Sequence, residues 1–157
     1  MDAVRTDVVA RLAGFPARLA VVAGHAAADE AIDGPPPGEW TAREVVAHLI
    51  AVEAAVWQAR LDGLVADPSE PAWGWTEPGP VTDPAAATLE GALGLFAAAR
   101  EATLARVAAL DEAGWARTGV HAVYGRLDVA ALLGIAADHD EEHLAGLAGR
   151  AAAGDPA

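Results

Sequence analysis

Three histidines in this chain have the residue type and the spacing of a metal site. His139 and His143 stand four positions apart in DHDEEHL at 138–144, a segment with helical character, so their imidazoles lie one turn apart on one face. Such a pair is able to hold one divalent metal ion. His48 lies in a second helical segment and supplies a third ligand if the two helices pack together. Three protein ligands with an open position are typical of catalytic metal sites.

The same histidines also have interpretations that involve no metal. Three partly buried imidazoles could be hydrogen-bonded to the backbone or to nearby acids in a protein core. His139 and His143 could instead be solvated residues of an acidic helix surface, since residues 140–142 are all carboxylic acids. Spacing alone leaves these interpretations open, because histidine pairs with helical spacing also arise by chance.

Composition points to one helical domain with an acidic surface. The chain has 157 residues, of which 54% are hydrophobic and 5% aromatic, so a core must be built largely from Ala, Leu and Val. Abundant alanine favours helices. The formal net charge of −13 disfavours nucleic acids and anionic membranes as partners. We expect one domain over residues 1–150, a flexible tail over 151–157, and neither a nucleic-acid nor a membrane partner.

The chain contains no cysteine, which excludes several kinds of site. A sequence without cysteine has no disulfide, no thiolate metal ligand and no cysteine nucleophile of its own. Residues 1–7 lack the basic and apolar segments of a secretion signal, and no uncharged apolar run is as long as a membrane span. We therefore expect a cytoplasmic protein.

Two helices are predicted in the first half of the chain. Apolar residues recur every three or four positions over about 2–29, although Pro16 should bend or weaken this helix. The second helix covers about 42–65 and begins with Thr41 as N-cap, with a glutamate three positions later that completes a capping box. His48 lies beside its apolar stripe, so its side chain is expected to point inward.

Two more helices are predicted in the second half. The third begins with Asp83 as N-cap and Pro84 at its first position, and the fourth with Asp128 as N-cap. The segment 67–80 is a long connection whose two tryptophans either cover the end of the bundle or line a pocket. With no credible strand pattern, the fold class is all-α. We predict a four-helix bundle whose long connection between helices 2 and 3 lets the chain cross between helices that are not nearest neighbours.

Ordered motifs resemble those of the DinB-like superfamily. They are GEWTAREVVAHL at 38–49, GWARTGVH at 114–121 and DHDEEHL at 138–144. Their order and spacing fit from about residue 38 to residue 147. The resemblance implies a four-helix bundle in which a divalent metal is held by His48, His139 and His143. We expect Zn or Ni, with Fe or Mn as alternatives.

The resemblance also implies an activity. The wider superfamily includes enzymes that transfer low-molecular-weight thiols, such as bacillithiol or mycothiol, to electrophiles, and relatives suggest a homodimer. A metal with three neutral ligands keeps its positive charge, so a coordinating small-molecule thiol is deprotonated and becomes a nucleophile. The same site could activate water for hydrolysis. A third possibility is a metal-binding, stress-related bundle without turnover.

Other residues near the expected metal could have more than one role. His121 precedes the last helix and could act as an acid, a base or a substrate contact, or be a surface loop residue with no such role. Glu44 could accept a hydrogen bond from His48 or serve only in the capping box. Glu53 is rotated away from His48 and should face another helix or solvent. Gly146 stands where relatives often have glutamine, so any contact of that glutamine is absent.

Overall fold

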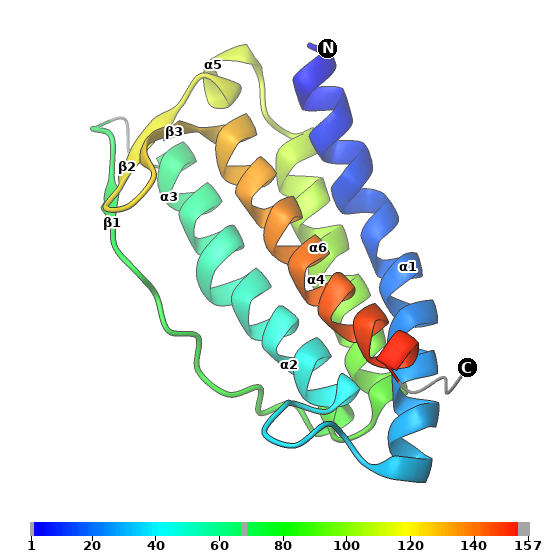
Figure 1. The fold of residues 1–157 in the computed structure, drawn as a ribbon. Coiled ribbons are helices and arrows are strands. Elements are labelled where there is room, and N and C mark those ends of the chain that lie inside the picture. The colour runs from blue at the N-terminus through cyan, green and yellow to red at the C-terminus, as the bar shows by residue number, and fades with distance from the viewer. Residues whose placement is uncertain (1, 67–68, 154–157) are drawn as a thin grey trace.

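The predicted four-helix bundle is confirmed in the computed structural model, which describes residues 2–66 and 69–153, with side chains described as far as residue 150. Four long helical segments occur in these ranges: α1 (Ala3–Asp33), α2 (Ala42–Val52) continued by the π-helix η1 (Glu53–Gln58) and by α3 (Ala59–Ala66), α4 (Leu89–Ala108) and α6 (Val129–Ala153). They lie side by side as one bundle (Figure 1). Because α6 continues to Ala153, only residues 154–157 of the expected tail remain, and they lie outside the described residues.

The first helix is longer and more continuous than its sequence indicated. Asp2 caps it by accepting a hydrogen bond from the Val4 amide, and the helix runs through Pro16 to Asp33. It ends at Gly34, whose φ of 76° is a conformation that glycine adopts without strain. By length and mean hydropathy, 1.2 in its most apolar window, α1 would also suit a membrane span. Its buried side chains nevertheless pack on the other helices of the bundle, as those of a core helix do.

The connection between the second and third long helices is long because those helices run in the same direction. Figure 1 shows the chain leaving α3 at one end of the bundle and returning along its outside to begin α4 at the other end. A tight turn is unable to join parallel helices. The prediction that this connection separates non-neighbouring helices was wrong, because α2 packs directly on α4.

The third long helix begins later than predicted. Asp83 does accept a hydrogen bond from a backbone amide, that of Ala85 at 2.9 Å, but it caps only the short 3-10 turn η2 (Pro84–Ala87). Thr88 is extended, with φ −113° and ψ 155°, and its side chain caps α4 by accepting from the Gly91 amide. Two successive caps therefore replace the single helix start that the sequence indicated.

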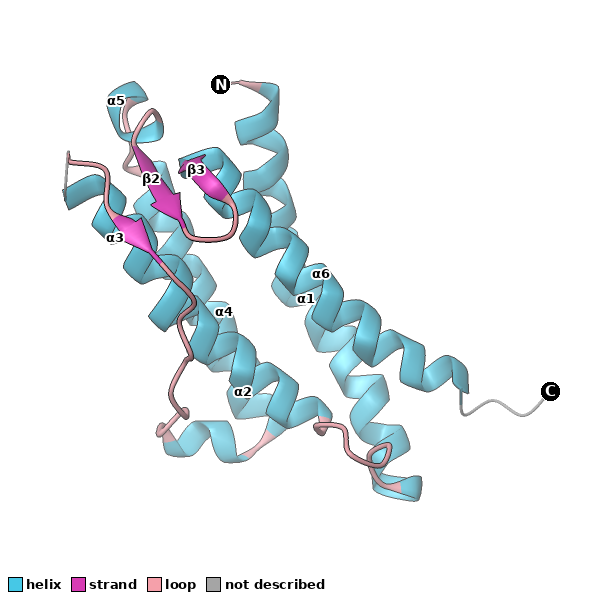
Figure 2. Cartoon of the chain, turned by 60° about the vertical axis from the view of Figure 1, so that its left-hand side comes forward, coloured by secondary structure: helices cyan, strands magenta, loops and turns pink. Residues whose placement is uncertain are grey.

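A small sheet at one end of the bundle was not predicted. Within the described ranges it has three strands in the order β1 (Ala72–Trp73), β2 (Thr118–His121) and β3 (Gly125–Asp128). β1 pairs with β2 in parallel and β2 with β3 antiparallel, near α3, the start of α6 and the short helix α5 (Glu112–Trp115) (Figure 2). Strands of two to four residues are too short to show alternating hydrophobicity, which explains the missed prediction.

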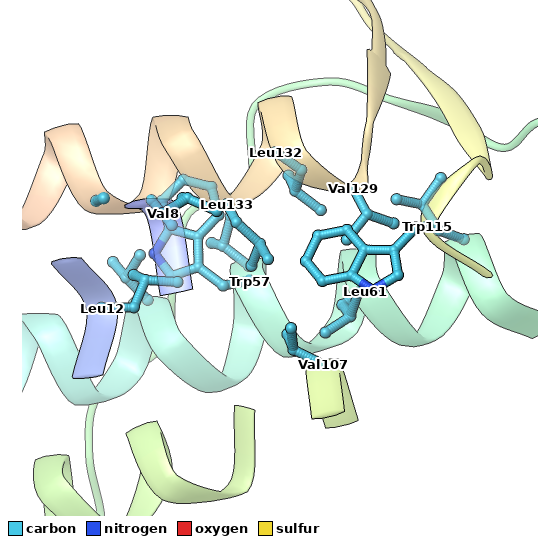
Figure 3. Close-up of a cluster of buried hydrophobic side chains, with 14 residues drawn as sticks. Val8, Leu12, Trp57, Leu61, Val107, Trp115, Val129, Leu132 and Leu133 are labelled. Atoms are coloured by element: carbon cyan, nitrogen blue, oxygen red, sulfur yellow. The ribbon is translucent and has the colours of Figure 1, made fainter. Parts of the chain in front are cut away.

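The core has an apolar cluster towards each end, with a buried polar layer between them. The cluster nearer the sheet is shown in Figure 3 and includes Val8, Leu12, Trp57, Leu61, Trp115 and Leu133. The other includes Phe15, Leu19, Val46, Leu49, Phe96 and Leu147. Between them lie Glu53, Arg100, Thr103 and Asp140, each about 1% exposed, which we call the polar layer. The three histidines occur at this level of the bundle.

Candidate metal centre

The bundle brings the three predicted histidines together. His48 comes from α2, and His139 and His143 come from α6. One potential ligand atom from each residue lies within 4.8 Å of the others, and the ring centroids are 4.6–5.6 Å apart. The histidines are half-buried and face one another, so the interpretation of His139 and His143 as solvated surface residues does not hold.

Local sequence features explain how these side chains are held. Thr41 and Glu44 form the predicted capping box, with a 3.2 Å bond from the Glu44 amide to the Thr41 hydroxyl and a 2.8 Å bond from the Thr41 amide to the Glu44 carboxylate. Asp128 caps α6 by accepting from the Ala131 amide at 2.8 Å. Both helices that carry histidines therefore begin at defined residues, which fixes the rotation of each ligand about its helix axis.

Burial keeps the imidazoles neutral. Burial, together with the neighbouring histidines, lowers the pKa of His139 and of His143 to about 4. The pKa of His48 is also lowered, again mainly because of burial. Neutral imidazoles are the form that binds metals, so the cluster is ready to bind a metal at neutral pH.

The donor atoms fit a divalent transition metal. The Nε2 atoms of His139 and His143 are 3.2 Å apart, close to the separation of about 3.3 Å expected for two nitrogens at tetrahedral zinc–nitrogen distances. In a metal complex through Nε2, the other ring nitrogen carries the proton and usually finds an acceptor. Nδ1 of His139 is buried without a hydrogen-bond partner among the described residues. Glu44, the candidate partner of His48, is engaged with Thr41 instead.

The polar layer lies in the core next to the histidine cluster. Most of its residues were not predicted from the sequence. Arg100 donates two hydrogen bonds to Glu53, at 3.0 and 2.8 Å, and its Nη2 lies 2.8 Å from a carboxylate oxygen of Asp140 in an ion pair. Burial raises the pKa of Asp140 to about 7, an effect that Arg100 opposes. Asp140 directly follows His139 in the chain. The ion pair with Arg100 therefore holds α6 in place next to a candidate metal ligand. Glu53 faces another helix, one of the two positions expected for it.

Two cavities meet at His48. The first has a volume of about 540 Å³ and is lined by His48, His139 and His121, with apolar walls that include Val52, Val56, Trp57, Trp75 and Ile135. The second, of about 560 Å³, has a more charged lining that includes Arg43, Glu44, Glu77 and Asp83. His48 and Pro78 line both. Trp75 thus takes the pocket-lining position, one of the two roles considered for the tryptophans of this segment.

The π-helix η1 brings Trp57 to the ligand side of its helix. Nine residues of α-helix make about 2.5 turns, which would leave Trp57 on the face opposite His48. The wider turns of η1 rotate the chain less per residue, and both side chains line the apolar cavity. The Trp57 ring meets the His139 ring edge-on, with centroids 5.8 Å apart. No apolar periodicity marks a π-helix, so this contact could not be predicted from the sequence.

The chain matches a family profile and resembles a solved structure. The profile of the DinB superfamily matches residues 1–147. The chain belongs to the DinB superfamily. Among solved structures it resembles YfiT from Bacillus subtilis, described as a probable metal-dependent hydrolase with an unusual four-helix bundle topology. The TM-score is 0.70 at 22% identity, with 93% of this chain and 86% of YfiT covered, so the likeness concerns the fold. No curated protein matches the chain.

His121 is a buried residue next to the candidate site of this DinB protein, and not a surface loop residue. It is 4% exposed, belongs to β2, and lines the same cavity as His48 and His139. Its Nδ1 accepts hydrogen bonds from the amides of Val123 and Tyr124, at 3.0 and 3.3 Å. A catalytic role for His121 remains a prediction.

Two other positions lie near the cluster or on its helix. Arg60, a residue that no sequence pattern marked, is 7% exposed and lines the apolar cavity. Gly146 is an exposed residue of α6 with open space around it.

Proposed function

We propose that this DinB protein is a metal-dependent transferase that activates a low-molecular-weight thiol and transfers it to an electrophile. His48, His139 and His143 would hold the metal, with Zn or Ni as the expected ion. When bound, a divalent metal there lowers the pKa of a coordinating thiol and so supplies a thiolate nucleophile at neutral pH.

The observation that supports a two-substrate reaction is the position of His48 between two cavities. A reactant in either cavity would lie against a ligand of the same metal. The charged cavity with Glu44, Glu77 and Asp83 suits a polar thiol cosubstrate, whereas the apolar cavity with Trp57 suits the carbon skeleton of an electrophile. Holding both reactants at one metal would supply the proximity that such a transfer needs.

A metal-dependent hydrolase is the second candidate. Its support is the fold likeness to YfiT, itself described as a probable metal-dependent hydrolase. A hydrolase would use the same three histidines but would need water in place of the thiol. The two candidates therefore differ in whether product formation requires a thiol.

The test measures turnover with and without thiol. Protein with one equivalent of Zn or Ni is incubated with 1-chloro-2,4-dinitrobenzene and a panel of small thiols, and in parallel with 4-nitrophenyl acetate without thiol. We expect thiol-dependent product with the first substrate. His48→Ala should lose both bound metal and product, whereas His25→Ala, an exposed histidine of α1, should keep both.

Each alternative result has a distinct meaning. Release of nitrophenol without thiol, abolished in His48→Ala, would favour the hydrolase over the transferase. Full metal content without turnover in either reaction would favour a metal-binding bundle. Full metal content in purified His48→Ala would show that the ligand set is wrong.

A further inference from the structure

A buried arginine in the apolar cavity has no carboxylate partner in the described residues. Arg60 lies in the first turn of α3 and is 7% exposed, between the rings of Trp57 and Trp73 at 5.8 and 6.0 Å from their centroids. Its Nη2 donates to the Gly74 carbonyl at 3.0 Å, and its Nε has no hydrogen-bond partner among residues 2–66 and 69–153. A buried cation is costly unless an anion compensates it.

A second donor lies in the same cavity wall. Because Nδ1 of His121 accepts two backbone amides, the proton of the neutral ring is on Nε2. Burial and the nearby Arg60 both lower the pKa of His121, so the ring stays neutral and Nε2 remains a donor at pH 7. Arg60 and His121 thus offer positive charge and an N–H group to the same cavity.

The acids that line this cavity leave the arginine available. Asp138 pairs with Arg11 of α1 at 2.6 Å, and Glu142 is an exposed residue of α6 next to His143. Neither forms an ion pair with Arg60. Burial lowers the pKa of Arg60, and among the described residues no carboxylate opposes that effect.

We propose that Arg60, assisted by Nε2–H of His121, binds a carboxylate of the substrate that occupies the apolar cavity. The electrophile is then an organic acid, with its apolar body against Trp57 and Ile135 and its reactive carbon directed towards the histidine cluster. The statement that the bound acid is the electrophile rests on the proposed function. The carboxylate site itself does not depend on a bound metal.

The probe pair is 3-phenylpropionate and its amide, which have the same shape and differ in charge. Binding of each is measured by calorimetry to metal-loaded protein and to protein stripped with a chelator. We expect the acid to bind more tightly than the amide in both preparations, by about 10- to 100-fold, as for hydrogen bonds to charged groups. Tighter binding of the acid only when metal is present would overturn the proposal, because the carboxylate would then be bound by the metal.

Variants separate loss of the carboxylate contact from damage to the cavity. Arg60→Gln should remove the preference for the acid and leave amide binding unchanged, and Arg60→Lys should keep part of the preference because the charge remains. His121→Asn retains an acceptor for the backbone amides but lacks the Nε2 donor, so it should reduce the preference. Arg106→Gln, a change to an exposed arginine paired with Asp62 on the surface, should change nothing.

The outcomes distinguish this inference from the proposed function. Equal binding of acid and amide to the wild type, or equal weakening of both by Arg60→Gln, would overturn the carboxylate site. A chain that binds the acid through Arg60 but takes up no metal would support the site and refute the transferase.

Discussion

At the scale of single residues, the candidate metal centre of this DinB protein consists of histidines that are kept neutral. Burial lowers the pKa of His139 and His143 to about 4 in the folded state, below the ordinary histidine value of 6.5. Protonation of either ring would place a charge in a half-buried cluster beside the cation of Arg100. The same surroundings that favour a neutral metal ligand therefore make the metal-free protein sensitive to acid.

We predict that the metal-free protein loses stability as the pH falls from about 6.5 to about 4. In this window the unfolded chain binds protons that the folded histidines do not, so the free energy of unfolding decreases with decreasing pH. His143→Gln should show a shallower dependence. Urea titrations of chelated protein at several pH values measure both slopes, and equal slopes would show that the pKa of His143 is not lowered.

At the scale of elements, the small sheet holds one wall of the apolar cavity. Trp73 of β1 contacts the Arg60 guanidinium on one side and lies against Gly119 of β2 on the other. A Cβ at position 119 would lie 2.2 Å from the Trp73 ring and 2.9 Å from the carbonyl oxygen of Pro71. The close approach of β1 to β2 thus requires glycine at this position.

Gly119→Ala is expected to lower the free energy of unfolding by about 1–3 kcal/mol, because the methyl group forces Trp73 or the β1 backbone to move. Displacement of Trp73 should also weaken acid binding at Arg60. The matched control is Gly146→Ala on α6, which has open space and should stabilise the helix by up to about 1 kcal/mol. Chemical denaturation compares the two variants, and an unchanged stability of Gly119→Ala would contradict the tight contact.

At the scale of the whole molecule, the polar layer ties the bundle together at the level of the metal site. Arg100 of α4 donates to the Leu12 carbonyl of α1 at 3.3 Å, to Glu53 of η1, and pairs with Asp140 of α6. Its guanidinium also lies 5.1 Å from the centroid of the Phe96 ring, in the cluster farther from the sheet. One side chain therefore links the four long helical segments and separates the two apolar clusters.

Arg100→Met should destabilise the protein by about 3–5 kcal/mol, because it leaves two buried carboxylates without their cation. Arg106→Met, which removes an exposed ion pair with Asp62, should cost about 1 kcal/mol or less. Thermal and urea unfolding of both variants test this contrast. A loss of under about 1 kcal/mol for Arg100→Met would show that the layer contributes little to stability.

Local sequence patterns were enough to predict the four long helices, the fold class and the candidate ligands, although not every helix boundary. Capping residues such as Thr41 and Asp128 and the apolar periodicity are local signals, and the i, i+4 spacing of His139 and His143 needs only a helix. The motifs that resemble the DinB superfamily placed His48 with them, and the structure brought all three together.

The surroundings of those ligands depend on contacts between segments that are far apart in the sequence. The burial of Arg100 and Asp140 could not be predicted, because burial depends on which helices meet and not on local sequence. Arg60 is a candidate anion site only because the tertiary structure encloses it between α3 and the strands. The π-helix and the short strands escaped prediction because their extent is too small for any periodicity to develop.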